Sequence, residues 1–176
     1  IRTEQLAGQS YFPTAVEEDQ FSAIGNAVHS YFAALPSMRG LDDTGKERVA
    51  ERCLNAFSVS GSFAPSVIVA TGNRFIDWVE SKFPEAKWLT EIPVTAARAA
   101  GGKWNGTLDL VLELSNGTFV IIDHKSVPMR RQYCEAKAAT YAGQLEAYKE
   151  MLHTDETPVA ATWIHFPLAG VAVEFA

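Results

Sequence analysis

The sequence has very little cysteine. Cys53 and Cys134 are the only two among 176 residues, and their wide separation favours reduced or neutral thiols. Two thiols cannot supply the ligands of a four-cysteine metal site or an iron–sulfur cluster. We therefore expect no iron–sulfur cofactor in this chain.

Long apolar runs are also missing. No stretch approaches the roughly 20 apolar residues that a membrane helix needs, so we expect no membrane contact. The opening residues lack the basic and apolar regions of a signal peptide, the chain does not begin with Met, and there is no Walker A motif. We expect one domain over residues 1–176, excised from a larger protein and without an ATPase of its own.

An excess of basic charge is absent as well. The net charge is −6, which argues against a free-standing, high-affinity nucleic-acid binder because phosphate binding is largely electrostatic. It does not exclude a catalytic module that receives its substrate from attached domains. With 47% hydrophobic and 20% charged residues, the composition is that of a globular domain and not of a disordered segment.

The first half of the chain carries apolar residues at helical spacing. Thr14 and Glu17 have the spacing of a capping box ahead of the first helix, and Pro36 should end that helix. The expected helices cover residues 21–35, a segment capped at residues 42–44, and residues 65–83.

The second half of the chain is dominated by strand patterns. Strands are expected at residues 87–97, 103–114, 118–125, 160–166 and 171–175, with one helix at residues 135–153. Asn116-Gly117 is a strong signal for a hairpin turn between the second and third strands. This order predicts an α/β fold, with a central mixed sheet flanked by helices and preceded by an α-rich N-terminal segment.

Two aspartates and a lysine stand out in the segment GTLDLVLELSNGTFVIIDHKS, residues 106–126. Asp109 lies in the first strand of the expected hairpin. Asp123 and Lys125 end the second strand, where they share one face about 7 Å apart. Such charges are costly at the end of a strand unless they hold a hard divalent cation and position a water or a phosphate. Each member alone also has an ordinary explanation, since aspartates often end strands.

These residues resemble a known family. The segments GTLD and IIDHKS, the downstream YAGQLEAYKEML and the upstream Gly25-x-x-x-His29 are similar to the PD-(D/E)xK nucleases, and within them to the RecB-type nuclease domain of RecB- and AddA-like helicase–nucleases. The resemblance covers residues 25–166. It implies a restriction-endonuclease-like core and dependence on Mg²⁺ or Mn²⁺.

The resemblance also implies roles for individual residues. Asp109, Asp123 and His29 would bind the metal together with the backbone carbonyl of His124, and Lys125 would orient or activate the attacking water. Mn²⁺ tolerates an imidazole ligand better than Mg²⁺ does. By itself, His29 is also compatible with a core or interface histidine beside an apolar stripe.

Further candidates lie around this set. Glu91 matches a Glu-x-Pro segment of similar nucleases, where it would touch the metal's water shell or the lysine, but it also fits a solvated strand. Gln144 and Tyr148 share a helix face, and the resemblance implies contact with DNA phosphate or with the lysine. An ordinary amphipathic helix is the alternative. Arg130 and Arg131 would meet the DNA backbone at the mouth of the site or would simply be solvated.

The implied function is hydrolysis of phosphodiester bonds in DNA, as an exonuclease or an endonuclease. The resemblance points to single-stranded DNA delivered by helicase domains or subunits, during end processing and recombinational repair in the bacterial cytoplasm. The alternative is a catalytically silent module of the same fold, used for DNA binding or subunit docking. Silent copies usually lose an acid or the lysine, whereas this chain keeps all three. A phosphate-ester hydrolase of another fold is the weaker rival.

Overall fold

A six-stranded mixed sheet forms the centre of the computed structural model, which describes residues 1–14, 16–97 and 102–175. The strand order is β1-β6-β5-β4-β3-β2. β4 and β5 run parallel, and the other neighbouring pairs run antiparallel. The strands are β1 (Arg2–Gln5), β2 (Lys87–Ala97), β3 (Lys103–Glu113), β4 (Phe119–His124), β5 (Val159–Phe166) and β6 (Val171–Phe175).

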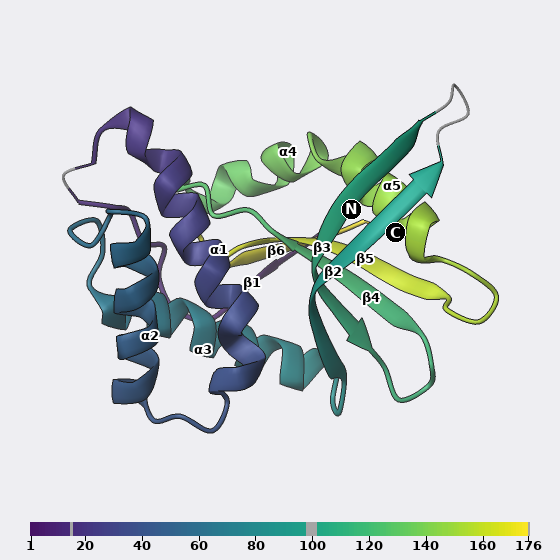
Figure 1. Ribbon diagram of the computed structural model, residues 1–176, viewed down its shortest axis with the longest axis horizontal. Helices are drawn as coiled ribbons and strands as arrows, with labels where there is room; N and C mark the ends of the chain where they lie inside the picture. Colours follow the sequence, from purple (N-terminus) through teal and green to yellow (C-terminus); the bar gives the residue numbers. More distant parts are fainter. Residues whose placement is uncertain (15, 98–101, 176) are drawn as a thin grey trace.

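Helices lie on both faces of this sheet (Figure 1). The first three pack together on one face and the last two on the other, with the connection between β4 and β5 passing through the latter. This confirms the predicted α/β fold. The helices are α1 (Phe21–Met38), α2 (Asp43–Ala56), α3 (Pro65–Lys82), α4 (Cys134–Ala139) and α5 (Ala142–Leu152).

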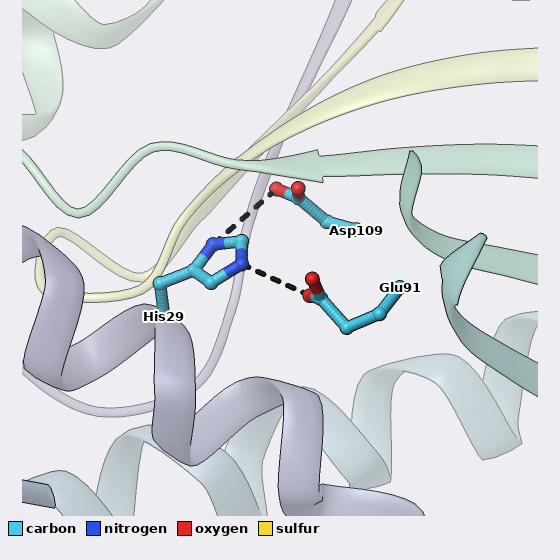
Figure 2. Close-up of side chains that lie close together, drawn as sticks. All are labelled: His29, Glu91 and Asp109. Carbon is cyan, nitrogen blue, oxygen red and sulfur yellow. Dashed lines mark hydrogen bonds and ion pairs between the residues drawn. The ribbon is translucent and has the colours of Figure 1, made fainter. Parts of the chain in front are cut away.

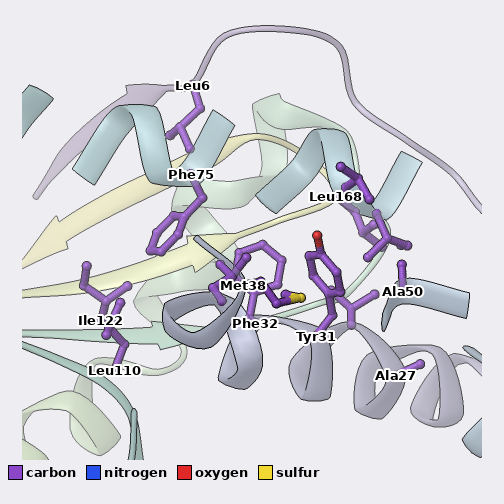
Figure 3. Close-up of a cluster of buried hydrophobic side chains, with 14 of the residues drawn as sticks. Leu6, Ala27, Tyr31, Phe32, Met38, Ala50, Phe75, Leu110, Ile122 and Leu168 are labelled. Atoms are coloured by element: carbon purple, nitrogen blue, oxygen red, sulfur yellow. The ribbon is translucent and has the colours of Figure 1, made fainter. Parts of the chain in front are cut away.

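The main core fills the space between the sheet and α1–α3 (Figure 3). Leu110 and Ile122 reach it from β3 and β4, because alternate residues of a strand point to one face. They meet Phe32 and Phe75 from the helices, all nearly fully buried. Burying each such side chain contributes roughly 1.5–3 kcal/mol, so this packing fixes α1 over the ends of β3 and β4.

None of the helices among the described residues combines the length and the apolarity that crossing a bilayer requires.

Two helix boundaries differ from the predicted ones. α1 continues through Pro36 to Met38. Proline is tolerated there because it lies in the last turn, where only one hydrogen bond of the helix is lost. The helix predicted for residues 135–153 is two helices, separated at Thr140 and Tyr141.

The N-terminal region also differs from the prediction. Thr14 does not cap α1; its hydroxyl and its N–H both bond the carbonyl of Ser62. The capping-box pair is instead Glu17 and Gln20, at the short 3-10 turn before α1. The chain moreover begins with β1, an edge strand paired with β6, and not with a helical segment. Its four residues show too little alternation to be recognised in the sequence.

Arg74 on α3 connects this N-terminal segment to the β5–β6 turn through hydrogen bonds. Its guanidinium donates to the carbonyl of Gln9, at 2.6 Å, and to that of Pro167, and it stacks 5.4 Å from the ring of Tyr11. Gly170 lies against the same group with φ 65°. A Cβ at Gly170 would come within 2.7 Å of the guanidinium carbon.

We predict that Gly170→Ala destabilises the protein more than Gly117→Ala. Both residues have positive φ, which costs an L-residue about 1–2 kcal/mol. Only position 170 adds a clash, since an added Cβ at Gly117 meets open space, and overpacking costs about 1–3 kcal/mol. Urea unfolding measures the difference, and equal losses in the two variants would contradict this packing.

Candidate active site

The two aspartates meet at the end of the β3–β4 hairpin. Asn116 and Gly117 make the predicted turn, with Gly117 at φ 81°, and Leu110 pairs with Ile122. The next residues along the two strands are Asp109 and Asp123. One Asp109 oxygen accepts the backbone N–H of His124 at 2.7 Å. The hairpin therefore brings the two carboxylates together as the sequence predicts.

Three potential metal ligands converge beside this point (Figure 2). His29 comes from α1, Glu91 from β2 and Asp109 from β3, and one ligand atom of each lies within 4.8 Å of the others. His29 Nε2 donates to Glu91 at 2.9 Å, and Nδ1 lies 3.8 Å from Asp109. The imidazole thus bridges two carboxylates from adjacent strands.

Glu91 reaches this cluster because the alternation of side chains between the two faces of the sheet is interrupted in β2 and, at the paired positions, in β3. Leu89 and Ile92, three positions apart, pack in one cluster near α5, and so do Leu108 and Val111. Glu91 lies inside this interruption with φ 55°, a conformation that costs a non-glycine residue energy and concentrates at functional sites.

Asp123 faces the other side of the site. One oxygen lies 2.8 Å from the Lys125 ammonium, and the other accepts the Gln144 amide at 3.4 Å. The same amide nitrogen donates to the Tyr148 hydroxyl at 2.9 Å. Tyr148 is buried, and a side chain at Gly106 would come within 2.9 Å of its ring. Gln144 therefore contacts an acid and not the lysine.

The electrostatics of the pair are strained. Burial and, after it, the Asp123 carboxylate raise the pKa of Asp109 to about 6, although His29, the His124 N–H and Lys125 oppose the rise. Burial likewise raises the pKa of Asp123, although Lys125 opposes the rise. For Lys125, burial disfavours the charge, but the two aspartates outweigh it and raise its pKa. The site therefore holds two acids that resist ionisation and a lysine that keeps its proton.

His124 lies with its side chain in the core, turned away from the carboxylates. Its Nδ1 is 3.0 Å from Nδ1 of His165, and its ring packs against Phe32 and Phe75. Burial lowers the pKa of His124 to about 3, so the ring is neutral. The Lys125 N–H bonds the His165 carbonyl at 2.8 Å, which fixes the backbone that follows Asp123. Metal ligation by the His124 carbonyl stays a prediction.

The two arginines after β4 have different surroundings. Arg131 donates to the carbonyls of Ala169, at 2.8 Å, and Gly8, so it ties the N-terminal segment to the β5–β6 turn. Arg130 is exposed. Both line a cavity with Phe12, on the side of Thr3 and Gln5. Contact of either arginine with DNA stays a prediction.

The donor set fits a hard divalent cation. Carboxylate oxygens suit Mg²⁺, and an added imidazole nitrogen suits Mn²⁺. A cation would also offset the repulsion between Asp109 and Asp123. In the structure, His29 and Lys125 provide part of this compensation. In the structure the three closest donors include Glu91, while Asp123 stands next to them. The identity of the ligands stays a prediction.

A cavity of about 360 Å³ continues from this cluster. His29 and Lys125 form its edge, and the sequence patterns did not single out several other lining residues. Those on α1 could have been found from helical spacing, because positions 22, 25, 26 and 29 share one face of a helix. The residues that line it besides the two edge residues are Phe21, Ser22, Gly25, Asn26, His124, Ser126, Val127 and Pro128.

Comparison with protein families gives a match along almost the entire chain. A model described as the PD-(D/E)XK nuclease superfamily matches residues 3–173, a range that contains every site residue named above. The sheet with helices on both faces is consistent with the restriction-endonuclease-like fold. A search of curated proteins found no match.

We predict that Mn²⁺ binding depends on both strands of the cluster. Asp109→Asn and Glu91→Gln keep the side-chain shape but remove a charged ligand, so calorimetric titration should show affinity reduced by at least about tenfold. Glu113→Gln is the matched control, because Glu113 ends the same strand and pairs with Lys87 on the surface. Unchanged Mn²⁺ affinity in Asp109→Asn would refute the site.

We further predict that Mn²⁺ stabilises the protein more at about pH 7.5 than at about pH 5. Without metal, the folded state holds a proton on Asp109 more tightly than the unfolded state, because the pKa is about 6 and not 3.8. That stabilisation is complete below the unfolded value and is lost as the pH rises through about 6. Metal needs the ionised carboxylate, so its effect grows over the same interval.

Thermal denaturation with and without Mn²⁺ checks this dependence on pH. Asp109→Asn has no titrating group at position 109, so its response to pH should be flatter than that of the parent. An equal Mn²⁺-induced shift in Tm at both pH values in the parent protein would contradict the prediction.

Proposed function

The chain belongs to the PD-(D/E)XK nuclease superfamily, and on this premise we propose that it is a metal-dependent nuclease that hydrolyses phosphodiester bonds in DNA. One observation carries the proposal: two largely buried carboxylates, a charged lysine and a histidine–glutamate pair converge at the end of the β3–β4 hairpin. Negative groups to hold a cation and a positive group to meet a phosphate are the components that this hydrolysis requires.

His29, Glu91 and Asp109 would hold the cation, with Asp123 next to them. When bound, a divalent cation supplies positive charge to the scissile phosphate and acidifies a water molecule. The protein's own contribution is to present Asp109 and Asp123 on one rigid hairpin, where His29 and Lys125 offset part of the cost of ionising them.

Lys125 would act as a donor and not as a base. Its pKa is raised by the two aspartates, so at neutral pH the ammonium keeps its protons and cannot accept another. Placed 2.8 Å from Asp123, it can orient the attacking water and stabilise the negative charge that develops on the phosphate.

Gln144 would position Asp123. Its amide spans the Tyr148 hydroxyl and the aspartate oxygen, which holds the carboxylate toward the lysine. The buried Tyr148 supports this amide, so direct contact of its ring with DNA is not part of the proposal. Contact of Gln144 with DNA phosphate, which the sequence resemblance implies, stays a prediction beside these roles.

The finer assignment is a RecB-type nuclease that cuts single-stranded DNA supplied by a helicase, in end processing and repair. Support comes from Gly25-x-x-x-His29, which places the histidine of α1 against Glu91 and Asp109. The net charge of −6 also favours delivery of the strand by another domain. A silent module is disfavoured because Asp109, Asp123 and Lys125 are all present, Lys125 lies 2.8 Å from Asp123, and Asp109 is close enough for both to affect its pKa.

We predict that Lys125→Ala folds and binds Mn²⁺ but cleaves single-stranded DNA at least about a hundredfold more slowly, the typical loss for one transition-state contact. Lys137→Ala is the matched control, because Lys137 lies over the same Tyr141 ring, 5.2 Å from its centroid against 4.8 Å for Lys125. Its cleavage rate should stay close to that of the parent.

Cleavage of a labelled oligonucleotide with Mg²⁺ or Mn²⁺ measures both variants. A parent protein that binds metal and DNA without cutting either single- or double-stranded DNA would favour the silent module. A Lys125→Ala rate equal to that of the parent would remove the lysine from the mechanism.

A further inference from the structure

The cavity next to the metal cluster has features that the metal chemistry does not explain. Of the large apolar side chains that are exposed among the described residues, two line it: Phe21 at 42% and Val127 at 40% exposure. They come from α1 and from the loop after β4. Exposed apolar side chains that line a cavity offer a surface for a flat apolar group.

Polar groups in the same cavity also lack an internal explanation. Ser126 is only 8% exposed, and its hydroxyl has no hydrogen-bond partner within the part of the chain that the structure describes. Buried hydroxyls are normally paired. Asn26 is exposed on the same helix face as His29. The lining therefore combines apolar walls with unused polar groups, as sites for small organic ligands do.

Gly25 keeps the cavity open. A Cβ placed there meets no atom within 4 Å, and Gly25 lines the cavity, so a larger side chain would have room to extend into it. Glycine in the middle of a helix is otherwise unfavourable. The helix therefore has a residue that weakens it at a position that lines the cavity.

We propose that this cavity receives the nucleoside adjacent to the scissile phosphate, with its base stacked on Phe21. The inference rests on the proposed nuclease function. His29 and Lys125 line the cavity and belong to the reacting site, so a phosphate held there places its neighbouring sugar and base at the cavity. The volume of about 360 Å³ falls within the range of pockets for small ligands.

Stacking on an aromatic ring would give affinity without strong sequence preference, because every base has a flat face. The Ser126 hydroxyl and the Asn26 amide can bond the sugar or the phosphate next to it. Stacking also favours a strand whose bases are unpaired, since a base inside a duplex cannot lie against the ring. This agrees with single-stranded DNA as substrate.

The test is an abasic scan with Mn²⁺. A labelled single-stranded oligonucleotide carries one abasic residue, moved position by position, and the rate of cutting at each bond is measured. For the parent, removing the base at one fixed position beside the cut should slow cleavage at least about tenfold, in line with the loss of one stacked base. Phe21→Ala should cut the intact oligonucleotide about as slowly, with no further loss at the abasic position.

Two variants serve as comparisons. Phe21→Trp keeps a stacking ring and should retain the abasic effect. Leu41→Ala removes an apolar side chain of matched exposure, 43%, just past the far end of α1, and should behave as the parent. Mn²⁺ titration should be unchanged in all three variants, because none of these side chains belongs to the metal cluster.

Gly25→Leu tests the cavity independently. The substitution favours the helix, so Tm should stay equal or rise, while cleavage should fall at least about tenfold because the side chain occupies the space for the nucleoside. A more stable protein with a slower reaction is not expected from a purely structural glycine.

The outcomes separate the two proposals. No cleavage by the parent with either metal overturns the nuclease function and this inference with it. Cleavage by the parent with a flat abasic scan, or the same abasic profile in Phe21→Ala, overturns the nucleoside site alone. Unchanged cleavage by Gly25→Leu would do so as well.

Discussion

The arrangement of the site depends on the repulsion between two carboxylates. Asp109 and Asp123 are both largely buried and close enough to raise the pKa of Asp109. Placing two negative charges together in a poorly solvated region is unfavourable unless positive or hydrogen-bond-donating groups surround them. The groups nearby supply such compensation: the His124 N–H and His29 for Asp109, and Lys125 and Gln144 for Asp123.

This compensation is incomplete, and the remainder explains why the site suits a cation. The pKa values of both aspartates stay raised despite the surrounding donors. A divalent ion would remove the repulsion that the protein alone leaves in place. The same two aspartates attract the Lys125 ammonium and raise its pKa, so one pair of acids prepares both the negative and the positive side of the site.

The hydrophobic core makes this unfavourable cluster possible. Phe32 and Phe75 pack against the imidazole of His124 on the inner side of β4, so the backbone beside Asp123 cannot relax away from Asp109. α1 is held over the sheet by the same core, which fixes the positions of His29 and Phe21 in the lining of the cavity. The site and the neighbouring cavity therefore share one rigid support.

Much of this arrangement is encoded locally. Alternation and the Asn116-Gly117 turn determine the β3–β4 hairpin, and the hairpin alone brings Asp109 to Asp123 and puts Lys125 on the same face as Asp123. Helical spacing determines α1 to α3 within a few residues. The local signals failed where the fold overrides them. At Pro36, the packed last turn of α1 tolerates the loss of one hydrogen bond. The break between α4 and α5 and the edge strand β1, which pairs with β6, were also not predicted.

Tertiary structure alone decided how the remaining candidate side chains contact one another. Glu91 contacts His29 because the alternation of side chains is interrupted at paired positions of β2 and β3. The alternation pattern of a single strand does not reveal such an interruption. The sequence also did not reveal that Gln144 and Lys125 both contact Asp123, one at each carboxylate oxygen. The cavity likewise forms only when α1 lies across the loop after β4. Periodicity depends on neighbours along the chain, whereas charge compensation and empty space depend on segments that meet only after folding.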